Sequence, residues 1–380
     1  MHRKTFLLIV FFSFLVSQPE DCSNGRYVDE IFDITINSNI YYGENENESI
    51  LGGAYNQELY LDVYSPANDD LENRPIIFFM FGGSFIGGTR VSPDIVALCT
   101  KYAQRGYVAV AIDYRLSQNL IFQGTEEVAY KAVLKAIHDV KAAIRYFRMM
   151  DEDSLDLYRV DTERIFVGGV SAGSIAAINA AYLDKIEEVP SFLLDEFDSL
   201  GGFDGFSGNQ GYDSSFHGVV NLCGAVGDAN WIEEGDVPIV SMHGDQDTVI
   251  PYDESLVTLF GLNIIVDGSY VINQKMLELG NYSSLYTYVN QGHVPFGNMI
   301  FESAFTSEFL YEVVCAVDSN YLLGDINFDE EINILDVVSL VNFILGASEP
   351  NSLEFEVSDM NSDSNLNVQD IIVLINTILN

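Results

Sequence analysis

Basic residues are scarce in this sequence of 380 residues, which has 17 Lys and Arg against 57 Asp and Glu and a formal net charge of −40. A surface with so much negative charge repels phosphate backbones and anionic lipid headgroups. Nucleic-acid binding and attachment to a membrane through a basic patch are therefore excluded. The acidic excess fits solubility in salty surroundings, or loops that bind divalent cations.

Long apolar runs are missing as well. The N-terminal run over residues 6–16 is too short to cross a bilayer, which takes about 20 residues, and no later run is long enough either. It follows His2, Arg3 and Lys4 and precedes a polar segment, an order typical of a secretory signal peptide. We therefore predict a signal peptide over residues 1–18, a secreted protein and no transmembrane segment. The alternative is a buried N-terminal helix.

Cysteine is limited to Cys22, Cys99, Cys223 and Cys315. The absence of a CxxC pair and of a Cys/His cluster excludes a zinc site of the usual spacing. In an exported chain, four cysteines favour two disulfides, which have three possible connectivities. Buried free thiols are the alternative.

A packed core is expected because 48% of the residues are hydrophobic and only 19% are charged. Apolar runs of strand type alternate with helical stretches, which predicts a mostly parallel sheet covered by helices on both faces. The predicted strands cover residues 59–64, 76–81, 107–112, 165–168, 219–222, 239–242 and 285–289, and the predicted helices include 96–104, 126–150 and 172–182. The glycine- and aromatic-rich segment 190–216 interrupts this alternation, and it is either a lid or substrate loop or an inert surface excursion.

A single G-x-S-x-G pattern occurs, formed by Gly169, Ser171 and Gly173. The pattern alone is weak evidence, but it stands between a predicted buried strand and an alanine-rich predicted helix. That setting fits a nucleophile elbow, in which glycines allow a tight turn that exposes the serine hydroxyl. The alternatives are an ordinary glycine-rich turn and a phosphate-binding loop, but no Walker lysine or G-x-G-x-x-G accompanies it. We predict that Ser171 is a nucleophile.

A nucleophilic serine requires a general base and an orienting acid, which on this kind of sheet follow it in the order acid, then histidine. His293 is the only histidine after the candidate acids, and it comes just after the last predicted strand. The acid is expected in HGDQDTVIPY, where we favour Asp247 because Asp245 falls in the turn directly after Gly244. Asp253 is a further candidate.

An oxyanion hole requires backbone N–H groups, one of them from the residue after the nucleophile. Ala172 occupies that position. A second source follows an early strand, where FGGSFIGG supplies an exposed glycine-rich backbone. We therefore predict that Gly83 and Ser84 complete the hole, the alternative being a plain glycine turn.

Five segments carry a family resemblance, and in chain order they are FGGSFIGG, GYVAVAIDYRL, GGVSAGS, HGDQDTVIPY and GHVPF. In this order they resemble the serine carboxylesterase and lipase branch of the α/β-hydrolase superfamily. The resemblance implies an eight-stranded, mostly parallel sheet with helices on both faces, in a domain over residues 22–316. It also implies a Ser171–Asp247–His293 triad that acts through an acyl-enzyme without a catalytic cofactor. Two departures are Phe81, where such esterases often have His or Tyr, and Ser84, where they have Gly.

The C-terminal residues 319–380 contain eleven acidic residues and no Lys or Arg. Two segments repeat oxygen-bearing residues at positions 1, 3, 5, 7, 9 and 12 of a loop, and each precedes a predicted apolar helix, at 337–345 and 371–379. Ca²⁺ takes six to eight oxygen ligands, which loops of this spacing supply. We predict two structural Ca²⁺ ions, held by Asp325, Asn327, Asp329, Glu331, Asn333 and Asp336 and by Asp359, Asn361, Asp363, Asn365, Asn367 and Asp370.

This repeat resembles a type I dockerin, which we place over residues 321–380. The resemblance implies calcium binding and docking onto a cohesin-type scaffold protein. Loop position six, normally Gly, is Glu330 in one repeat and Ser364 in the other, which predicts weaker calcium binding or a strained loop. The positions expected to read the cohesin also depart from the usual Ser/Thr pairs, and they are Ile334, Leu335, Val368 and Gln369.

The sequence as a whole predicts a secreted serine ester hydrolase that a calcium-binding module tethers to a scaffold or to the cell surface. Carbohydrate esters fit the docking module, while lipids or polyesters fit the aromatic content equally well. The alternatives are a serine peptidase on the same fold and a catalytically silent hydrolase fold used for adhesion.

Overall fold

The computed structural model describes residue 22 and residues 24–49, 52–117, 119–153, 155, 157–315, 323–327, 332–346, 350, 355, 357–361 and 365–379. The predicted signal peptide lies outside these residues. The chain divides into two compact units, one over Asn24–Val314 and the other containing Cys22 and the residues from Cys315 onward. Within the described part of the chain, no helix combines the length and the hydropathy that crossing a membrane takes.

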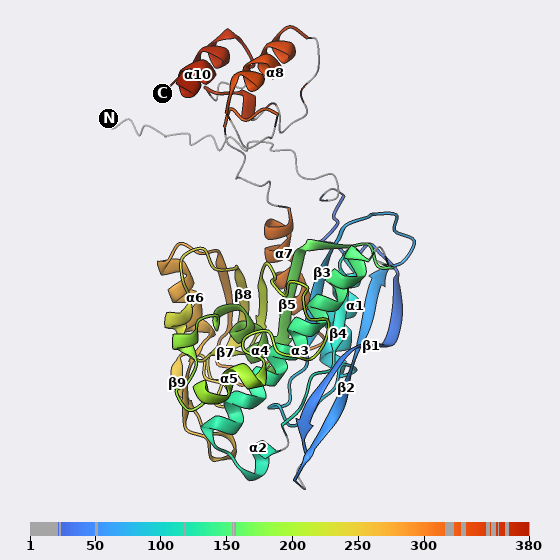
Figure 1. Cartoon of the computed structure of the whole chain (residues 1–380), viewed down its shortest axis with the longest axis vertical. Helices are drawn as coiled ribbons and strands as arrows, with labels where there is room; N and C mark the ends of the chain where they lie inside the picture. The colour runs from blue at the N-terminus through green and yellow to red at the C-terminus, as the bar shows by residue number, and fades with distance from the viewer. Residues whose placement is uncertain are drawn as a thin grey trace, which may run out of the picture. The chain divides into compact units, whose positions relative to one another are not determined.

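The larger unit is built on an eight-stranded sheet (Figure 1). Its order is β1 (Ile34–Glu48), β2 (Ala54–Pro66), β4 (Val108–Ile112), β3 (Arg74–Met80), β5 (Val160–Val170), β6 (Val219–Leu222), β8 (Ile239–Gly244) and β11 (Ser283–Tyr288). β1 and β2 are antiparallel to each other and β2 to β4, whereas all the other pairs are parallel. Every residue of β3, β4, β6 and β8 is buried, as expected of strands covered on both faces. The predicted eight-stranded, mostly parallel sheet is confirmed.

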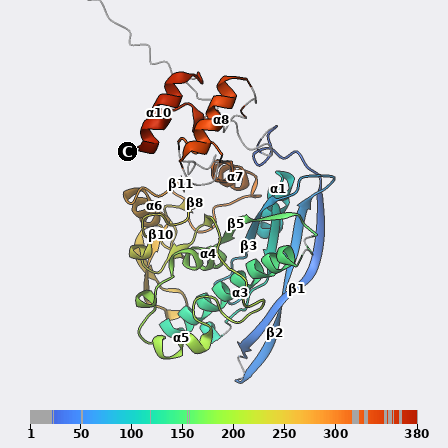
Figure 2. The same ribbon diagram turned by 45° about the horizontal axis from the view of Figure 1, so that its top comes forward.

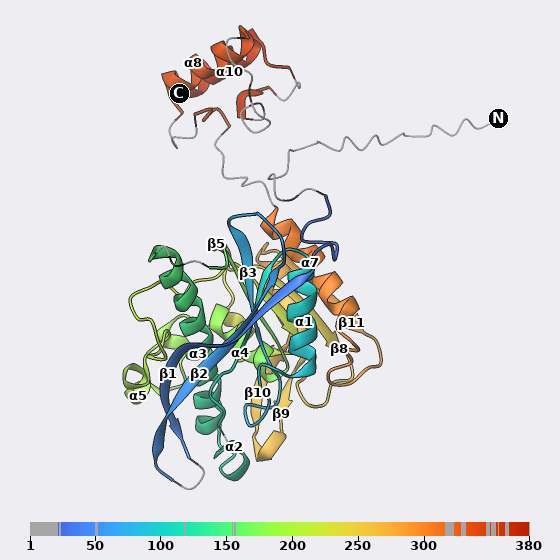
Figure 3. The ribbon, with the colours of Figure 1, turned by 90° about the vertical axis from the view of Figure 1, so that its right-hand side faces the viewer.

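Helices cover both faces of this sheet (Figure 3). α1 (Pro93–Gln104) packs against α7 (Ile300–Val314), while α3 (Glu126–Glu152) packs against α4 (Ala172–Tyr182) on the other face. The short α5 (Leu194–Leu200) lies beside α3 in Figure 2, and α6 (Ser269–Glu278) packs on β8 and β11. α2 (Asn119–Phe122) forms a single turn.

Two groups of strands were not predicted. β1 has a polar, largely exposed sequence with two register irregularities, so no alternation of apolar residues marks it. A second sheet, in the order β7 (Ala225–Val226), β10 (Ile264–Gly268) and β9 (Glu254–Val257), consists of strands of two to five residues. Such short segments carry little periodicity, and pairing with neighbours rather than local sequence decides their conformation.

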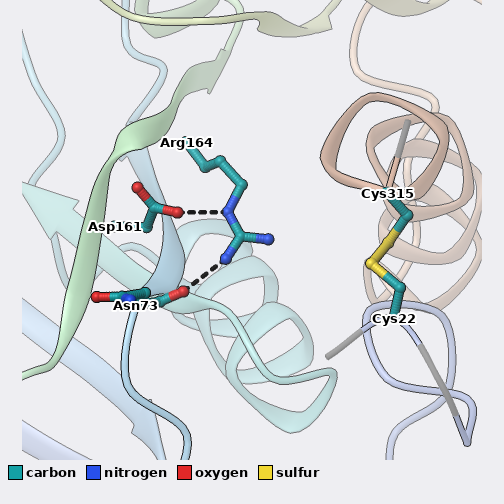
Figure 4. The surroundings of a disulfide bond; sticks show 5 residues. All are labelled: Cys22, Asn73, Asp161, Arg164 and Cys315. Carbon is teal, nitrogen blue, oxygen red and sulfur yellow. Dashed lines mark hydrogen bonds and ion pairs between the residues drawn. A yellow bond between two sulfur atoms is a disulfide. The ribbon is translucent and has the colours of Figure 1, made fainter. Parts of the chain in front are cut away.

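The cysteines form one disulfide where two were expected. Cys22 is bonded to Cys315, 293 residues away in the sequence, and Cys99 and Cys223 are buried free thiols. Cys99 belongs to α1, whereas Cys223 follows β6 directly, so the two thiols belong to different layers of the fold. Figure 4 shows the disulfide, together with Arg164, which donates hydrogen bonds to the Asp161 carboxylate and the Asn73 carbonyl.

The smaller unit contains α8 (Ile334–Ile344) and α10 (Val368–Leu379), which pack together around a small core that includes Val337, Leu340 and Leu374. Both helices begin three residues before the predicted starts. In α8 the reason is a cap at Asn333, whose side chain accepts a hydrogen bond from the Leu335 N–H. The capping residue was predicted only as a metal ligand, which obscured the start of the helix.

Candidate active site

Ser171 lies at a sharp turn between β5 and α4. Its φ of 54° and ψ of −117° are rare for a residue with a side chain, and they mark a strained turn. The flanking glycines make this turn possible, because a Cβ on Gly173 would lie 2.2 Å from the Met80 carbonyl oxygen and one on Gly169 would lie 2.3 Å from the Gly173 carbonyl carbon. The G-x-S-x-G pattern therefore has a steric cause, and it presents Ser171 at the carboxyl edge of the sheet.

The structure brings Ser171, His293 and Asp247 together. His293 Nε2 lies 2.8 Å from Ser171 Oγ, and His293 Nδ1 lies 2.6 Å from Asp247 Oδ2. The carboxylate cannot donate, so Nδ1 carries the proton and Nε2 is free to accept from the serine hydroxyl. The Asp247 side chain is fully buried, while that of His293 is 19% exposed. Three side chains from separate loops thus form one continuous chain of hydrogen bonds.

Asp247 is held as a carboxylate by several donors. Its Oδ1 accepts from the N–H groups of Val249 (2.8 Å) and Ile250 (3.0 Å), and its Oδ2 accepts from two histidines. Burial by itself raises the pKa of Asp247, but hydrogen bonds from His243 and His293 and from the Val249 N–H outweigh burial and lower that pKa. Asp247 is therefore ionised near neutral pH.

The two other candidate acids do not take part in this arrangement. Asp245 accepts a hydrogen bond from the Asn290 N–H, and its own N–H donates to the Tyr288 carbonyl, so it joins the loops that follow β8 and β11. Asp253 is exposed, and its carbonyl accepts from the Gly268 N–H.

His243 is a site residue that the sequence argument passed over. It is completely buried, and its Nε2 lies 3.1 Å from both Asp247 Oδ2 and the Ile250 carbonyl oxygen. Since that carbonyl can only accept, Nε2 carries the proton, and Nδ1 accepts from the Ser269 hydroxyl at 2.7 Å. The signal was present in HGDQD, where a histidine stands four residues before the acid, but only histidines able to act as a base were considered.

The Ser269 hydroxyl continues this chain into the sheet. Asn221, fully buried in β6, donates to Ser269 and to Ser241, at 2.9 Å each, and accepts from Ser174 at 2.6 Å. Ser174 belongs to the first turn of α4, three residues after the nucleophile. A buried polar network therefore connects the helix behind Ser171 to the carboxylate of Asp247, and such fully satisfied networks hold their members in one arrangement.

Cys223 is a neutral neighbour of these groups. Its sulfur, an Asp247 oxygen and a His293 nitrogen lie within 4.8 Å of one another. Burial raises the pKa of the Cys223 thiol far above its ordinary value. Both nitrogens of His293 are already engaged by Ser171 and Asp247, so this cluster is suited to proton transfer rather than to metal binding.

The predicted oxyanion residues lie at the same turn. Ala172 is the first residue of α4, where backbone N–H groups have no partner within the helix, and Ser84 lines a cavity together with Ser171 and Ala172. Gly83 has a φ of 127°, which a residue with a side chain rarely adopts, and Ser84 itself has a positive φ of 55°. The loop is thus held in an unusual backbone conformation beside the nucleophile.

Phe81, one of the two departures from the esterase pattern, receives support from another residue. The Tyr114 ring stacks on Phe81 with 4.2 Å between ring centroids, and the Tyr114 hydroxyl donates to the Phe81 carbonyl at 2.7 Å. This contact fixes the end of β3, from which the predicted oxyanion loop begins.

Comparisons with known proteins agree with this fold. The native esterase 2 of the planctomycete Thermogutta terrifontis superposes with a TM-score of 0.50 at 20% identity, over 73% of this chain and 95% of that chain. Its propionate-bound form gives a TM-score of 0.49 at 20% identity, over 71% and 94% of the two chains. No curated protein matches the sequence. The likeness to the native esterase establishes the fold, so the predicted α/β-hydrolase architecture is confirmed.

Sequence profiles identify both parts of the chain. The BD-FAE profile matches residues 61–207, and the profile of the Dockerin type I domain matches residues 323–379. The chain joins an esterase-like α/β-hydrolase domain to a type I dockerin domain. The two resemblances seen in the sequence are therefore confirmed.

Type I dockerin domains bind calcium, and the described residues of this one fit a cation. Asp336 and Asp370 are fully buried, and Asp325 and Asp359 are at most 9% exposed, although residues 319–380 contain no Lys, Arg or His. The Asn333 N–H donates to Asp336, and the Asn367 N–H donates to Asp370, at 2.8 Å each. Carboxylates gathered in this way are oxygen donors of the kind that Ca²⁺ prefers.

The remaining predicted ligands of the dockerin domain divide into two groups. Asp329, Glu331 and Asp363 lie outside the described residues, as do Glu330 and Ser364. The amide-bearing candidates Asn327, Asn333, Asn361, Asn365 and Asn367 lie in the loops beside the buried carboxylates.

The residues predicted to contact a cohesin lie on the surface of the dockerin domain. Ile334, Leu335 and Val368 are 56–64% exposed, and Gln369 is also exposed.

Proposed function

We propose that this protein is a secreted serine carboxylic-ester hydrolase with the triad Ser171, His293 and Asp247. The observation that carries the proposal is the unbroken series of hydrogen bonds from Ser171 through His293 to Asp247. It begins at a strained elbow and ends at a buried, ionised carboxylate, which is the arrangement that activates a serine for acyl transfer.

The reaction proceeds in two halves. Ser171 Oγ attacks the ester carbonyl carbon while His293 Nε2 takes the hydroxyl proton, and the carbonyl electrons move to the oxygen. The N–H groups of Gly83, Ser84 and Ala172 stabilise that oxyanion. As the carbonyl re-forms, the bond to the alcohol oxygen breaks and His293 gives that oxygen its proton. Water then attacks the acyl-enzyme with the same help from His293, which releases the carboxylic acid and returns the proton to Ser171.

Asp247 and His243 act on the orientation of His293. Asp247 keeps the proton of His293 on Nδ1 and stabilises the imidazolium that forms during each half-reaction. His243 Nε2 donates to the same carboxylate oxygen at 3.1 Å. Because this nitrogen already carries a proton, His243 does not act as a base. We assign His243 as a positioning residue that acts through Asp247.

The dockerin domain, over residues 321–380, is proposed to hold two Ca²⁺ ions and to bind a cohesin-type scaffold protein, while the hydrolase domain covers residues 22–316. Tethering raises the concentration of the enzyme near substrates gathered on the same scaffold. The Cys22–Cys315 disulfide supports secretion, since such bonds form and persist outside the reducing cytosol.

The test is hydrolysis of p-nitrophenyl butyrate by the wild type and by Ser171→Ala, with Ser199→Ala, an exposed serine of α5, as the matched control. We expect Ser171→Ala to lose activity by at least about 10⁴-fold and Ser199→Ala to retain it. Equal rates in wild type and Ser171→Ala would leave the silent adhesion fold as the better account. Faster cleavage of dipeptide p-nitroanilides than of the ester would favour the peptidase.

A further inference from the structure

A cavity opens beside Ser171, and its lining is apolar. Apart from Ser84, Ser171 and one amide, aliphatic and aromatic side chains form most of its wall. No acidic or basic side chain lines it among the residues that the structure describes, although the chain contains 57 Asp and Glu. In so acidic a protein, this lining favours an uncharged and apolar occupant.

The one amide in the lining is not available to a ligand. Asn179 donates to the carbonyls of Ile175 (2.7 Å) and Ala225 (3.1 Å), and its side-chain oxygen accepts from the Gly227 N–H at 3.1 Å. Besides Ser84 and Ser171, the hydroxyl of Tyr130 and the indole N–H of Trp231 are then the remaining polar side-chain groups of the lining. A group with several hydroxyls, such as a sugar, would lose hydrogen bonds to water here without replacing them.

The position of His293 shows which half of an ester the cavity takes. The leaving alcohol must stand next to His293 Nε2 to receive its proton. Ser84 and Ala172, the proposed oxyanion residues, line the cavity, whereas His293 is not among the described residues that line it. The cavity therefore extends from the carbonyl on the side away from the leaving group, and it holds the acyl part. The alcohol departs on the side of the partly exposed His293.

Besides α3 and α4, two further segments contribute to the wall of the cavity. One is the small sheet, where Val257 is paired with Ile264 and both face the cavity, while the next pair, Leu256 and Ile265, is 48% and 58% exposed. The other is the segment that contains α5, where Leu193 and Phe197 pack against Leu134 of α3. The lining runs along α3 from Ala129 to Ile137, which is about 12 Å at 1.5 Å per residue and exceeds the length of an acetyl group.

Side chains of α3 anchor the segment that contains α5. His138 Nε2 donates to the Gly202 carbonyl at 2.8 Å, and Arg145 donates to the carbonyls of Asp204 (2.9 Å) and Gly208 (3.0 Å). His138 and Arg145 are both buried in α3, and the hydrogen bonds from the cationic Arg145 are among the stronger ones. Of the two interpretations of residues 190–216, the structure favours a substrate loop over an inert surface excursion, because Pro190, Leu193 and Phe197 line the cavity beside Ser171.

We infer that the cavity binds a medium-chain aliphatic acyl group, so that the preferred substrates are esters such as octanoates rather than acetates or hydroxycinnamates. This inference rests on the proposed function and specifies its substrate class. Each methylene that enters an apolar cavity contributes about 4-fold to kcat/KM, provided that the gain is retained in the transition state.

The test is kcat/KM for p-nitrophenyl acetate, butyrate, octanoate and dodecanoate, measured beside the matching feruloyl ester. We expect the octanoate to exceed the butyrate by at least about 10-fold and the feruloyl ester to be slower than the octanoate. An optimum at the acetate or butyrate, or faster cleavage of the feruloyl ester, would overturn the inference while leaving the serine hydrolase intact. If no ester is cleaved, the proposed function fails first.

A cavity-filling variant tests the assignment of the wall. Val133 of α3 lines the cavity and is only partly buried, so Val133→Trp fills space at modest risk to folding. The octanoate-to-acetate ratio of kcat/KM should fall by at least about 10-fold. The same ratio should not change in Val91→Trp, a valine that is 56% exposed and lies outside the lining. An unchanged ratio in a folded Val133→Trp would contradict the assignment.

A second pair of variants keeps the inference testable if Val133→Trp does not fold. Leu193 lines the cavity and is 3% exposed, whereas its neighbour Leu194 is 43% exposed and does not line it. Leu193→Ala should move the preferred acyl chain toward the dodecanoate, and Leu194→Ala should not. The same chain-length profile in both variants would count against the proposed cavity.

Discussion

The hydrolase site and the dockerin loops both place carboxylates in buried positions, but they balance the negative charge differently. Asp247 is neighboured by two histidines and accepts from two backbone N–H groups, so the protein itself satisfies it. Asp336 and Asp370 are equally buried, yet no basic residue occurs between residues 319 and 380. The first site is complete once the chain has folded, whereas we expect the second to be balanced by an ion from solution.

The hydrolase domain and the dockerin domain also differ in what stabilises them. The hydrolase domain buries whole strands on both faces of its sheet, and the burial of this apolar surface stabilises its fold. The dockerin core contains a few side chains such as Ile326, Leu340 and Leu374. So small a core provides little stability of its own, and ion binding contributes directly to folding.

The largest expected effect is that of Asp247→Asn. The amide keeps the volume of the side chain but no longer stabilises the imidazolium of His293, and it allows the unproductive tautomer. We expect kcat for p-nitrophenyl butyrate to fall by about 10⁴-fold, while calcium binding to the dockerin domain stays as in the wild type. Steady-state kinetics and titration calorimetry measure the two quantities. A loss below 10-fold would remove Asp247 from the triad.

Calcium removal should affect the dockerin domain and leave ester hydrolysis unchanged. In EDTA, or in Asp336→Ala combined with Asp370→Ala, we expect the dockerin domain to lose its helical signal and its calcium heat, and ester hydrolysis to persist. Circular dichroism and titration calorimetry provide the readouts, with Asp70→Ala combined with Asp153→Ala, two exposed aspartates, as the control. Unchanged calcium binding in the first double variant would refute the ligand assignment.

A smaller effect is expected at His243. Removing a hydrogen bond to a charged carboxylate costs about 1.5–3 kcal/mol, so His243→Ala should lower kcat by about 10- to 100-fold with little change in KM. His243→Gln, which retains a donor, should recover part of this loss. Equal kcat values for the Ala and Gln variants would indicate that His243 has only a packing role.

The last expected effect concerns the stability of the fold rather than catalysis, and it arises at His138 of α3, beside the α5 segment. Burial lowers the pKa of His138 from 6.5 to about 4, so the folded chain stays neutral there while the unfolded chain takes up a proton. The free energy of unfolding is therefore unaffected by His138 above pH 6.5. It falls by about 3 kcal/mol in all as the pH is lowered from 6.5 toward about 4. Urea unfolding of His138→Gln should show a shallower decline over this interval. A parallel decline in both proteins would contradict the burial effect.

The sequence predicted the parts of the fold that carry strong local signals. Apolar runs such as those of β3, β4 and β8 located the central sheet, and the glycines around Ser171 located the elbow, because each requirement is met within a few residues. Ser171, Asp247 and His293 could be proposed together because their order along the chain limited the choice. The repeat of oxygen-bearing residues located the dockerin loops in the same way.

The features that were missed depend on residues far apart in the sequence. His243 is significant only because Ser269 and Asp247 lie on either side of its ring. Likewise, the acyl cavity exists because the short β9 and β10 pair with each other while α5 is anchored to α3. Neither pairing leaves a pattern in the local sequence, so only the assembled structure reveals them.

Covalent labelling tests the central claim most directly. An organophosphate such as diethyl p-nitrophenyl phosphate reacts with a serine only when its hydroxyl is activated, and the adduct can be located by peptide mass spectrometry. We predict stoichiometric labelling on Ser171, which is lost in His293→Ala while the exposed Ser199 stays unmodified. A folded protein that takes no label, or takes it on another residue, would contradict the account.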